Sequence, residues 1–165
     1  MNLNDNVHSC YKGKIIVSSY YFISSLRKLS KKHSILKFIY FPFLFLYRFF
    51  IDFFLKCELP PSCIVGKNLI IHHGHGIVIN NSVLLGDNVI IRHHTTIGNK
   101  IINGIDLGAP KIGNNVDIGA HSIIIGPITI GDNIVIGAGS VVISNLKSNS
   151  VYAGNPAKFI KKIIV

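Results

Sequence analysis

The feature that most constrains the fold of this chain is a repeat of six residues in its C-terminal part. Aliphatic residues recur at Ile112, Ile118, Ile124, Ile130, Ile136 and Val142, and a glycine follows four of them. Neither an α-helix, with about 3.6 residues per turn, nor an amphipathic strand, with a period of about two, gives this spacing. A period of six is typical of a parallel β-helix, in which each unit forms one face of a triangular coil and its aliphatic side chain points inward.

The repeat continues upstream with two interruptions. The upstream aliphatic positions are Val65, Ile71, Ile79, Leu85, Ile91 and Ile97. Their spacing is six except between Ile71 and Ile79, which are eight residues apart. Residues 99–111 break the repeat, and we expect them to bulge outward as a loop. The repeats amount to roughly four coils, enough for a stable repeat fold. The glycines fit the tight corners between faces, where a Cβ crowds and a positive φ is often needed.

The residues ahead of the repeat look helical at 15–33 and 35–56. We therefore expect an N-terminal helical segment at 1–57 and a β-helix domain with a C-terminal tail at 58–165. After Val142 the chain is expected to leave the coils through a turn-rich exit with a basic tail. The fold class is all-β, a parallel β-helix with a short helical segment before it.

Residues 35–55 are very apolar and rich in phenylalanine. The uninterrupted apolar run between Lys37 and Arg48 is ten residues long, which is too short to span a bilayer. Two arrangements stay open: a helix buried against the rest of the protein or a neighbouring subunit, and peripheral attachment to a membrane surface. Arg48 and Asp52 are four residues apart and can pair on one helical face. Pro42 is expected to kink or start a helix.

Charge narrows the function classes. The net charge of the chain is +10, and residues 1–57 hold nine Lys and Arg against two acids. A basic N-terminal part can approach an anionic membrane or polymer, or it can reflect cations dispersed on a solvated helix. Basic residues are not interleaved with stacking aromatics along the repeats, which disfavours nucleic-acid binding.

The cysteines Cys10, Cys57 and Cys63 are odd in number and have no CxxC spacing. This suits a reducing compartment and offers neither a disulfide framework nor a zinc site. The polar N-terminus shows no secretory signal. We therefore expect a cytoplasmic protein, with the inner face of the membrane as the place of any peripheral attachment.

Three histidines lie in the stretch IIHHGHGIVI, which spans the eight-residue interval. Neighbouring side chains of a strand point in opposite directions, so His72, His73 and His75 cannot all face one site. A zinc site that joins two of them to His93 or His94 lacks the usual ligand spacing, and no metal is predicted.

The chain resembles the hexapeptide-repeat acyltransferases of the serine acetyltransferase family, and within it the short exopolysaccharide O-acetyltransferases of the colanic-acid type. The matching stretches are IIHHGHGIVIN (70–80), GDNVIIRHHTTIGN (86–99), PKIGNNVDIGAHSIIIG (110–126), IGAGSVV (136–142) and AGNPAK (153–158). The resemblance implies a left-handed β-helix, a homotrimer, and acetyl-CoA as the donor, bound between adjacent subunits.

The chemistry that the resemblance implies needs a base and an oxyanion stabiliser. A hydroxyl attacks a thioester, so its proton must be taken as the bond forms, and histidine suits this role near neutral pH. The family's catalytic histidine corresponds to His73, and the acid that orients it corresponds to Glu58. His93 is expected to bind the acceptor or stabilise the oxyanion. His94 and His121 are expected to be outward-facing residues of the coils.

The resemblance also implies the cofactor site. The CoA positions correspond to Gly98, Ala120, Ala138 and Lys158, where small residues let pantetheine lie against the coils and lysine meets phosphates. The small residues can equally be explained by corner geometry alone.

Two departures from the serine enzymes bear on the acceptor. His72 replaces an aspartate, and Ala109 replaces a histidine. We therefore expect a sugar hydroxyl as acceptor, in surface polysaccharide biosynthesis (capsule, O-antigen or exopolysaccharide). A serine O-acetyltransferase of cysteine biosynthesis and a non-catalytic β-helix scaffold are the alternatives.

Overall fold

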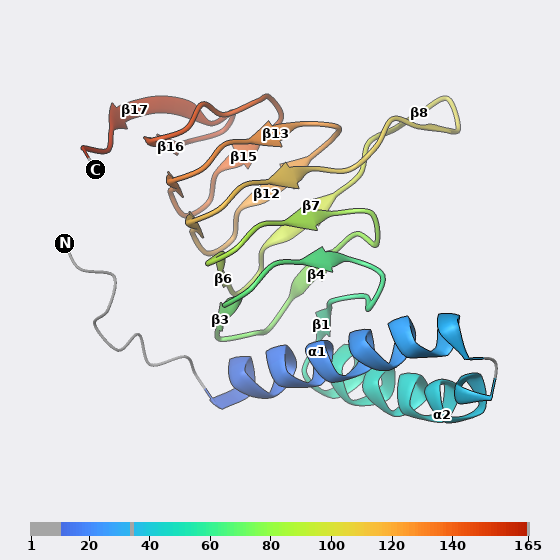
Figure 1. Ribbon diagram of the computed structural model, residues 1–165. Coiled ribbons are helices and arrows are strands. Elements are labelled where there is room, and N and C mark those ends of the chain that lie inside the picture. The colour runs from blue at the N-terminus through green and yellow to red at the C-terminus, as the bar shows by residue number, and fades with distance from the viewer. Residues whose placement is uncertain (1–10, 34, 165) are drawn as a thin grey trace.

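The computed structural model describes residues 11–33 and 35–164. These residues form a parallel β-solenoid of about five turns with two helices packed beneath its first coil (Figure 1). The β-helix and the N-terminal helical segment are thereby confirmed, and the three parallel faces are consistent with a left-handed β-helix. The first ten residues of the predicted helical segment, with Cys10 and most of the polar N-terminus, lie outside the described residues.

Three sheets form the faces of the solenoid. Face A contains β1 (Cys57–Glu58), β4 (Ile77–Ile79), β7 (Thr96–Gly98), β12 (Ile123–Ile125) and β15 (Val141–Val142). Face B contains β2 (Ile64–Val65), β5 (Leu84–Leu85), β10 (Lys111–Ile112) and β13 (Thr129–Ile130). Face C contains β3 (Ile70–His72), β6 (Ile90–Arg92), β11 (Val116–Ile118), β14 (Ile134–Ile136), β16 (Ser150–Ala153) and β17 (Lys158–Lys162), of which β17 is antiparallel to β16.

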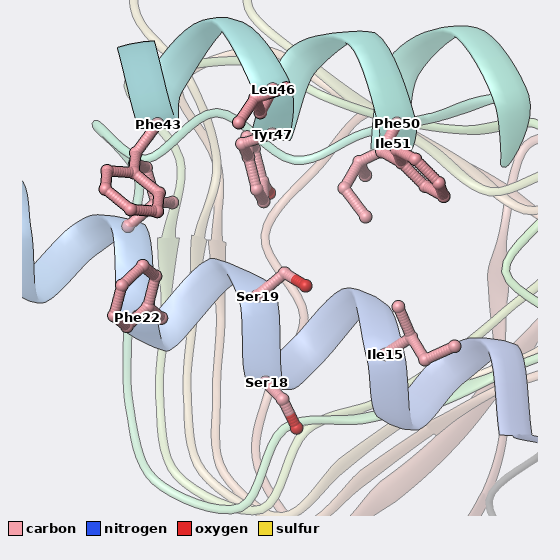
Figure 2. A pocket seen from close by; sticks show the side chains of 10 residues that line it. Ile15, Ser18, Ser19, Phe22, Phe43, Leu46, Tyr47, Phe50 and Ile51 are labelled. Carbon is pink, nitrogen blue, oxygen red and sulfur yellow. The ribbon is translucent and has the colours of Figure 1, made fainter. Parts of the chain in front are cut away.

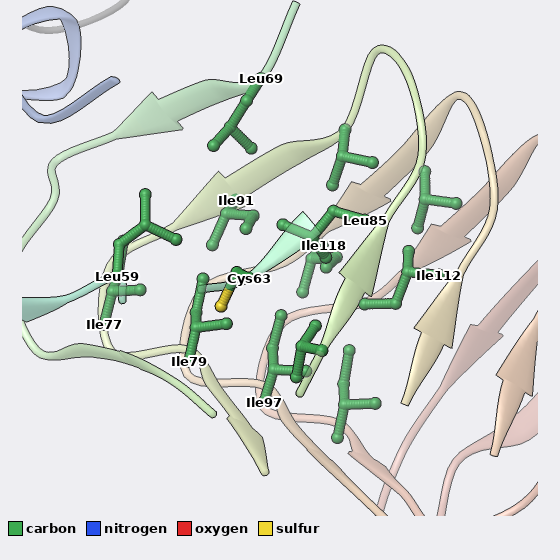
Figure 3. Close-up of a cluster of buried hydrophobic side chains, with 14 of the residues drawn as sticks. Leu59, Cys63, Leu69, Ile77, Ile79, Leu85, Ile91, Ile97, Ile112 and Ile118 are labelled. Carbon is green, nitrogen blue, oxygen red and sulfur yellow. The ribbon is translucent and has the colours of Figure 1, made fainter. Parts of the chain in front are cut away.

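The core consists of aliphatic side chains stacked in register from coil to coil (Figure 3). On face C the stacked residues are Ile71, Ile91, Ile118 and Ile136. On face A they are Ile79, Ile97, Ile124 and Val142. All eight are buried, and full burial of such a side chain stabilises a fold by roughly 1.5–3 kcal/mol. The register of the coils is therefore set by the six-residue repeat.

Both interruptions of the repeat lie at corners of the solenoid. Ile71 stacks on Ile91 and Ile79 on Ile97, so the first coil carries two extra residues between faces C and A. The predicted loop at 99–111 leaves the coils as a hairpin of β8 (Ile101–Ile102) and β9 (Ile105–Asp106) that projects from the stack (Figure 1). Its last residue, Lys111, already belongs to β10 on face B.

The predicted exit after Val142 is wrong. Leu146 forms a parallel bridge with Ile130, and Tyr152 pairs with Ile136. Both side chains are buried, so the chain stays in the last coil through β16 and turns back only in β17. This last stretch brings the roughly four predicted coils to about five turns. Its inward residues, one of them aromatic, do not show the aliphatic-glycine pattern.

Helix α1 (Tyr11–Lys32) covers the open end of the first coil. Its buried residues Ile16, Tyr20 and Ile23 recur every three to four positions and form one face of the helix, the pattern of an amphipathic helix on a core. The Tyr20 hydroxyl donates to the Cys63 carbonyl at 2.7 Å, and the Arg27 guanidinium donates to the Pro61 carbonyl at 3.1 Å. These donors satisfy carbonyls at the edge of the sheet stack. Burial raises the pKa of Tyr20 to about 12.

Helix α2 (Leu36–Arg48) continues into the π-helix η1 (Phe49–Phe54) and packs against α1 along one stripe. Tyr47 and Ile51 are buried there, and the Tyr47 hydroxyl donates to the Leu59 carbonyl at 2.6 Å. Most other residues of the two elements are exposed, so this chain by itself does not bury the helix. Burial against a neighbouring subunit stays a prediction, as does attachment to a membrane surface. Pro42 lies inside α2 and not at its start.

Two further predictions for this region can be compared with the structure. Arg48 Nε and Asp52 Oδ2 form the predicted ion pair at 2.9 Å. Within residues 11–33 and 35–164, every helix is too short or too polar to cross a membrane. The buried thiols of Cys57 and Cys63 are free, and burial raises the pKa of each to about 12.

The glycines at the corners between faces B and C show why a small residue is needed there. A Cβ on Gly86 would lie closer than 3.0 Å to the backbone of Gly113, and a Cβ on Gly113 equally close to Gly131. Crowding is thus confirmed as the reason for glycine here. The expected positive φ is wrong for these glycines, because the left-handed conformation falls two residues later, as at Asn115 and Asn133.

Those asparagines form a ladder along the whole solenoid. The residues are Asn68, Asn88, Asn115, Asn133 and Asn149, each with φ between 54° and 58°. Each side-chain amide donates to the side-chain oxygen of the next, at 3.0, 2.9, 2.9 and 2.8 Å in chain order. Asparagine tolerates the left-handed region better than other residues with a Cβ. The ladder therefore links all five coils through positions that also need this conformation.

Replacing Asn115 tests the ladder at its centre. Asn115→Ala removes two side-chain hydrogen bonds and puts a strained residue at positive φ, so we expect a loss of about 2–3 kcal/mol in the free energy of unfolding. Asn115→Gly removes the same bonds without that strain and should cost about 1 kcal/mol less. Urea unfolding at one protein concentration measures both, and equal losses would show that the left-handed conformation contributes nothing.

Candidate active site

The turn between β3 and β4 sends its three histidines to three different neighbours. His72 ends β3 and pairs in register with Arg92. The Nε2 atom of His75 lies 3.0 Å from the Lys12 ammonium nitrogen on α1. The His73 ring lies beside the ring of His93. The three side chains therefore do not share a site. The reason is the turn and not strand alternation, because β3 ends at His72, and His73 and His75 lie beyond it.

Two glycines let this turn fit its surroundings. A Cβ on Gly74 would overlap the Cδ1 atom of Ile16, which is fully buried on α1. Gly76 has a φ of +63°, and a Cβ there would overlap the imidazole of His94. The two-residue insertion is thus held between α1 on one side and the second coil on the other.

His73 and His93 form the centre of the candidate site. Their ring centroids are 6.1 Å apart and the planes are nearly perpendicular, at 82°. The Nδ1 atom of His93 is buried and has no hydrogen-bond partner within the described part of the chain. Burial lowers the pKa of His93, and the imidazoles of His121 and His94 lower it further. His93 therefore combines a lowered pKa with an unpaired, buried ring nitrogen, and its ring lies beside that of His73.

His94 and His121 surround His93. Their rings stack at 4.7 Å with an interplanar angle of 20°, and His121 lies 5.1 Å from His93. Both are exposed, as predicted, but their closeness to His93 was not foreseen. Each occupies the left-handed corner position, with φ of 55° and 60°. The alignment of successive coils brings His121 next to His93. In the sequence this alignment is hidden by the hairpin, which interrupts the six-residue spacing between the two residues.

Glu58 lies on β1 at the outer surface of face A, in register with Val78. Its side chain is exposed. Among the described residues, no hydrogen bond or ion pair joins Glu58 to His73. The orienting role of Glu58 stays a prediction.

The predicted CoA residues fall in two places. His93, Ala120 and Ala138 form a column at the corner between faces C and A, because the amide of His121 donates to the His93 carbonyl at 3.0 Å and that of Gly139 to the Ala120 carbonyl at 2.8 Å. The column runs toward the last coil, where Lys158 pairs with Ala153. Gly98 ends β7 at the opposite edge of face A, in register with Ile125.

His72 lies in a separate polar cluster on face C. The Arg92 guanidinium pairs with the Asp117 carboxylate, and one of its nitrogens lies 3.3 Å from Asp117 Oδ2. Burial lowers the pKa of His72, as does the positive charge of Arg92. In the described ranges, no three His, Cys, Asp or Glu side chains are grouped so that they could hold a metal ion.

Comparisons with known proteins agree with this architecture. The family described as "Hexapeptide repeat of succinyl-transferase" matches residues 111–144. A protein of Escherichia coli (strain K12), provisionally named colanic acid biosynthesis acetyltransferase WcaB, is 41% identical over 118 residues, which cover 71% of each chain.

Solved serine acetyltransferases have the same fold. The enzyme of Brucella abortus strain S19 in complex with coenzyme A superposes with a TM-score of 0.76 at 28% identity over 92% of this chain. The soybean enzyme complexed with serine gives 0.75 at 30% identity over 91%. This chain spans 57% and 58% of those two chains.

Three findings together define the class of protein: the repetitive β-solenoid, the histidines at the corner between faces C and A, and the extent of the similarity to WcaB. The chain belongs to the hexapeptide-repeat acyltransferases. Its relatives are acetyltransferases, both the WcaB type and the serine enzymes.

Gly76→Ala should destabilise the protein and displace the His94 ring. The left-handed backbone costs roughly 1–2 kcal/mol for a residue with a Cβ, and the overlap with His94 adds to it. Gly139→Ala is the matched control, because Gly139 has a φ of +68° at the same corner but nothing within 4 Å of its Cβ position. Urea unfolding should show the larger loss for Gly76→Ala, and equal losses would contradict the packing against His94.

His121→Asn should raise the pKa of His93. The substitution removes an imidazole that partly buries His93 and whose electrostatic interaction with His93 lowers its pKa, and both effects act in the same direction. Asparagine tolerates the φ of His121. Titration of the histidine ring signals by NMR measures the shift. His33→Asn, at an exposed position after α1, should leave it unchanged, and an unchanged or lower pKa in His121→Asn would contradict the coupling.

Proposed function

We propose that this protein transfers an acetyl group from acetyl-CoA to a sugar hydroxyl in surface polysaccharide biosynthesis. The observation that carries the proposal is the pairing of His73 with His93 at the foot of a column of small residues. The 41% identity to WcaB over 118 residues supports the sugar acceptor. The acetyl-CoA donor is supported by the Brucella serine acetyltransferase structure, which is a complex with coenzyme A.

In the proposed mechanism His73 is the general base. Its imidazole accepts the proton of the sugar hydroxyl as the oxygen attacks the thioester carbonyl. The tetrahedral intermediate then collapses, the C–S bond breaks, and the protonated His73 returns its proton to the CoA thiolate. Products are the O-acetyl sugar and free CoA. Glu58 would orient the ring and stabilise its protonated form.

His93 is proposed to bind the acceptor or the developing oxyanion. A neutral imidazole can donate from one nitrogen and accept at the other. An unpaired buried polar atom costs about 1–3 kcal/mol, so a ligand or a neighbouring subunit that satisfies Nδ1 would regain this energy. Burial lowers the pKa of His93 and so favours the neutral ring that this role needs.

The column above His93 is proposed as the path of the pantetheine arm. Ala120 and Ala138 leave room along the corner, and Lys158 would meet phosphate groups. Gly98, at the other edge of face A, would contribute from the neighbouring subunit of a homotrimer. The site would then be complete only between two copies of the chain.

Serine O-acetylation is the second candidate. The soybean serine acetyltransferase, solved with serine, covers 91% of this chain at a TM-score of 0.75. Against it, His72 and Ala109 stand where the serine enzymes have an aspartate and a histidine. The sugar acceptor is therefore our first choice.

The proposal is tested by CoA-thiol release from acetyl-CoA with sugar or oligosaccharide acceptors and with L-serine. We expect turnover with sugars, and a decrease of about 10²–10⁴-fold in kcat for His73→Ala, the usual contribution of a general base. His33→Ala is the control, because His33 is exposed and distant from the site. Robust turnover of serine would overturn the sugar acceptor, and unchanged sugar acetylation in His73→Ala would overturn the mechanism.

A further inference from the structure

Helix α2 and η1 carry an exposed aromatic surface, part of which lines the groove against α1. Eight of the ten phenylalanines of the chain lie in these two elements, and all eight are exposed. Phe45, Phe49 and Phe53 stack one turn apart, with ring centroids 6.2 and 5.7 Å apart and nearly parallel planes. We call the surface formed by the exposed phenylalanines of residues 38–54 the phenylalanine face.

The apolar surface continues into a groove between the two helices. Figure 2 shows Phe22 of α1 opposite Phe43 of α2, with Leu46 and Phe50 further along the same side. The groove has a volume of about 420 Å³ and is open to solvent. A water-soluble monomer rarely exposes a continuous apolar area of this kind without a partner.

Charge indicates which partner fits. Residues 11–60 hold nine Lys and Arg against Asp52 and Glu58, and Asp52 is already paired with Arg48. Cations lie at both ends of the phenylalanine face. Lys31, Lys32 and Lys37 lie where α1 ends and α2 begins, and the Lys56 ammonium lies 4.7 Å above the Phe53 ring.

We propose that the phenylalanine face binds the surface of an anionic lipid bilayer. The helix pair would lie in the plane of the interface, with the aromatic rings among the acyl chains and the terminal lysines at the headgroups. A second copy of the chain fits less well, since two basic faces would repel each other. Each described helix is too short or too polar to span the bilayer, so the attachment that we propose is peripheral.

This arrangement places a particular coil nearest to the lipid. The helices lie under the first coil (Figure 1), and that coil carries His73. Helix α1 also contacts the turn between β3 and β4, which we call the histidine turn, through Lys12 and Ile16. The candidate active site is thus at the membrane-proximal end of the solenoid.

The test is co-sedimentation of the full chain with vesicles of phosphatidylcholine alone and of phosphatidylcholine with phosphatidylglycerol. We expect binding to the anionic vesicles that weakens with added salt. The variant with Phe45→Gln, Phe49→Gln and Phe53→Gln should bind about tenfold more weakly. Its matched control changes three exposed apolar residues on the distant hairpin, Ile101→Gln, Ile102→Gln and Ile105→Gln, and should bind as wild type.

The outcomes separate the lipid from other partners. Circular dichroism and sedimentation velocity show whether the variants keep the fold and the assembly. Loss of vesicle binding with both unchanged supports the proposal. An altered assembly with unchanged vesicle binding would assign the face to a subunit contact and overturn it, as would equal binding of the two Gln variants. Acetyl transfer is not a readout here, so failure of the proposed function would leave the result intact.

Discussion

The in-register stacking of inward aliphatic side chains is the constraint on which the rest of this structure depends. Because Ile71, Ile91, Ile118 and Ile136 lie above one another, every other position of the repeat is also brought into a column. One corner thus gains the asparagine ladder, and another gains His93, Ala120 and Ala138. The candidate site is not built by a loop that folds over a cleft. It combines His73, from the two-residue insertion, with a column of the repeat that begins at His93.

The helical segment takes part in the site as well as in the fold. The first coil has no coil beneath it, and hydroxyl and guanidinium groups of the helices supply donors to its carbonyls. Helix α1 also packs on the inserted residues of the turn between β3 and β4, where Gly74 leaves room for Ile16. The conformation of His73 therefore depends on contacts made by α1, and a change in the seating of α1 on the first coil would reach the reactive end of the molecule.

Much of the fold could be predicted because the period of six depends on local sequence alone. The two-residue insertion and the outward hairpin followed from breaks in that period. The continuation of the last coil to Tyr152 could not be predicted, because the buried positions at the end of the stack are filled by residues that do not follow the pattern. The exposure of α2 could not be predicted from the sequence either, because an apolar helix is usually buried and only the packing shows which of its sides is covered. In the site, His73 and His93 were identified through a family resemblance, and their proximity followed the register. The grouping of His121 with them required counting coils across the hairpin, and Glu58 lies on another face from which its reach to His73 could not be judged.

The asparagine ladder has a consequence for how a protein of this kind can change in length. Each amide in the ladder donates to the next coil in the same direction, so removing or duplicating one complete coil leaves every junction with the same partner. Any other change in length would move asparagines, glycines and aliphatic residues onto the wrong faces. It is tolerated only at a corner, where the extra residues can leave the stack, as they do at the histidine turn and at the β8–β9 hairpin. The length of the solenoid can therefore change only by whole coils, and extra residues can be inserted only at its corners.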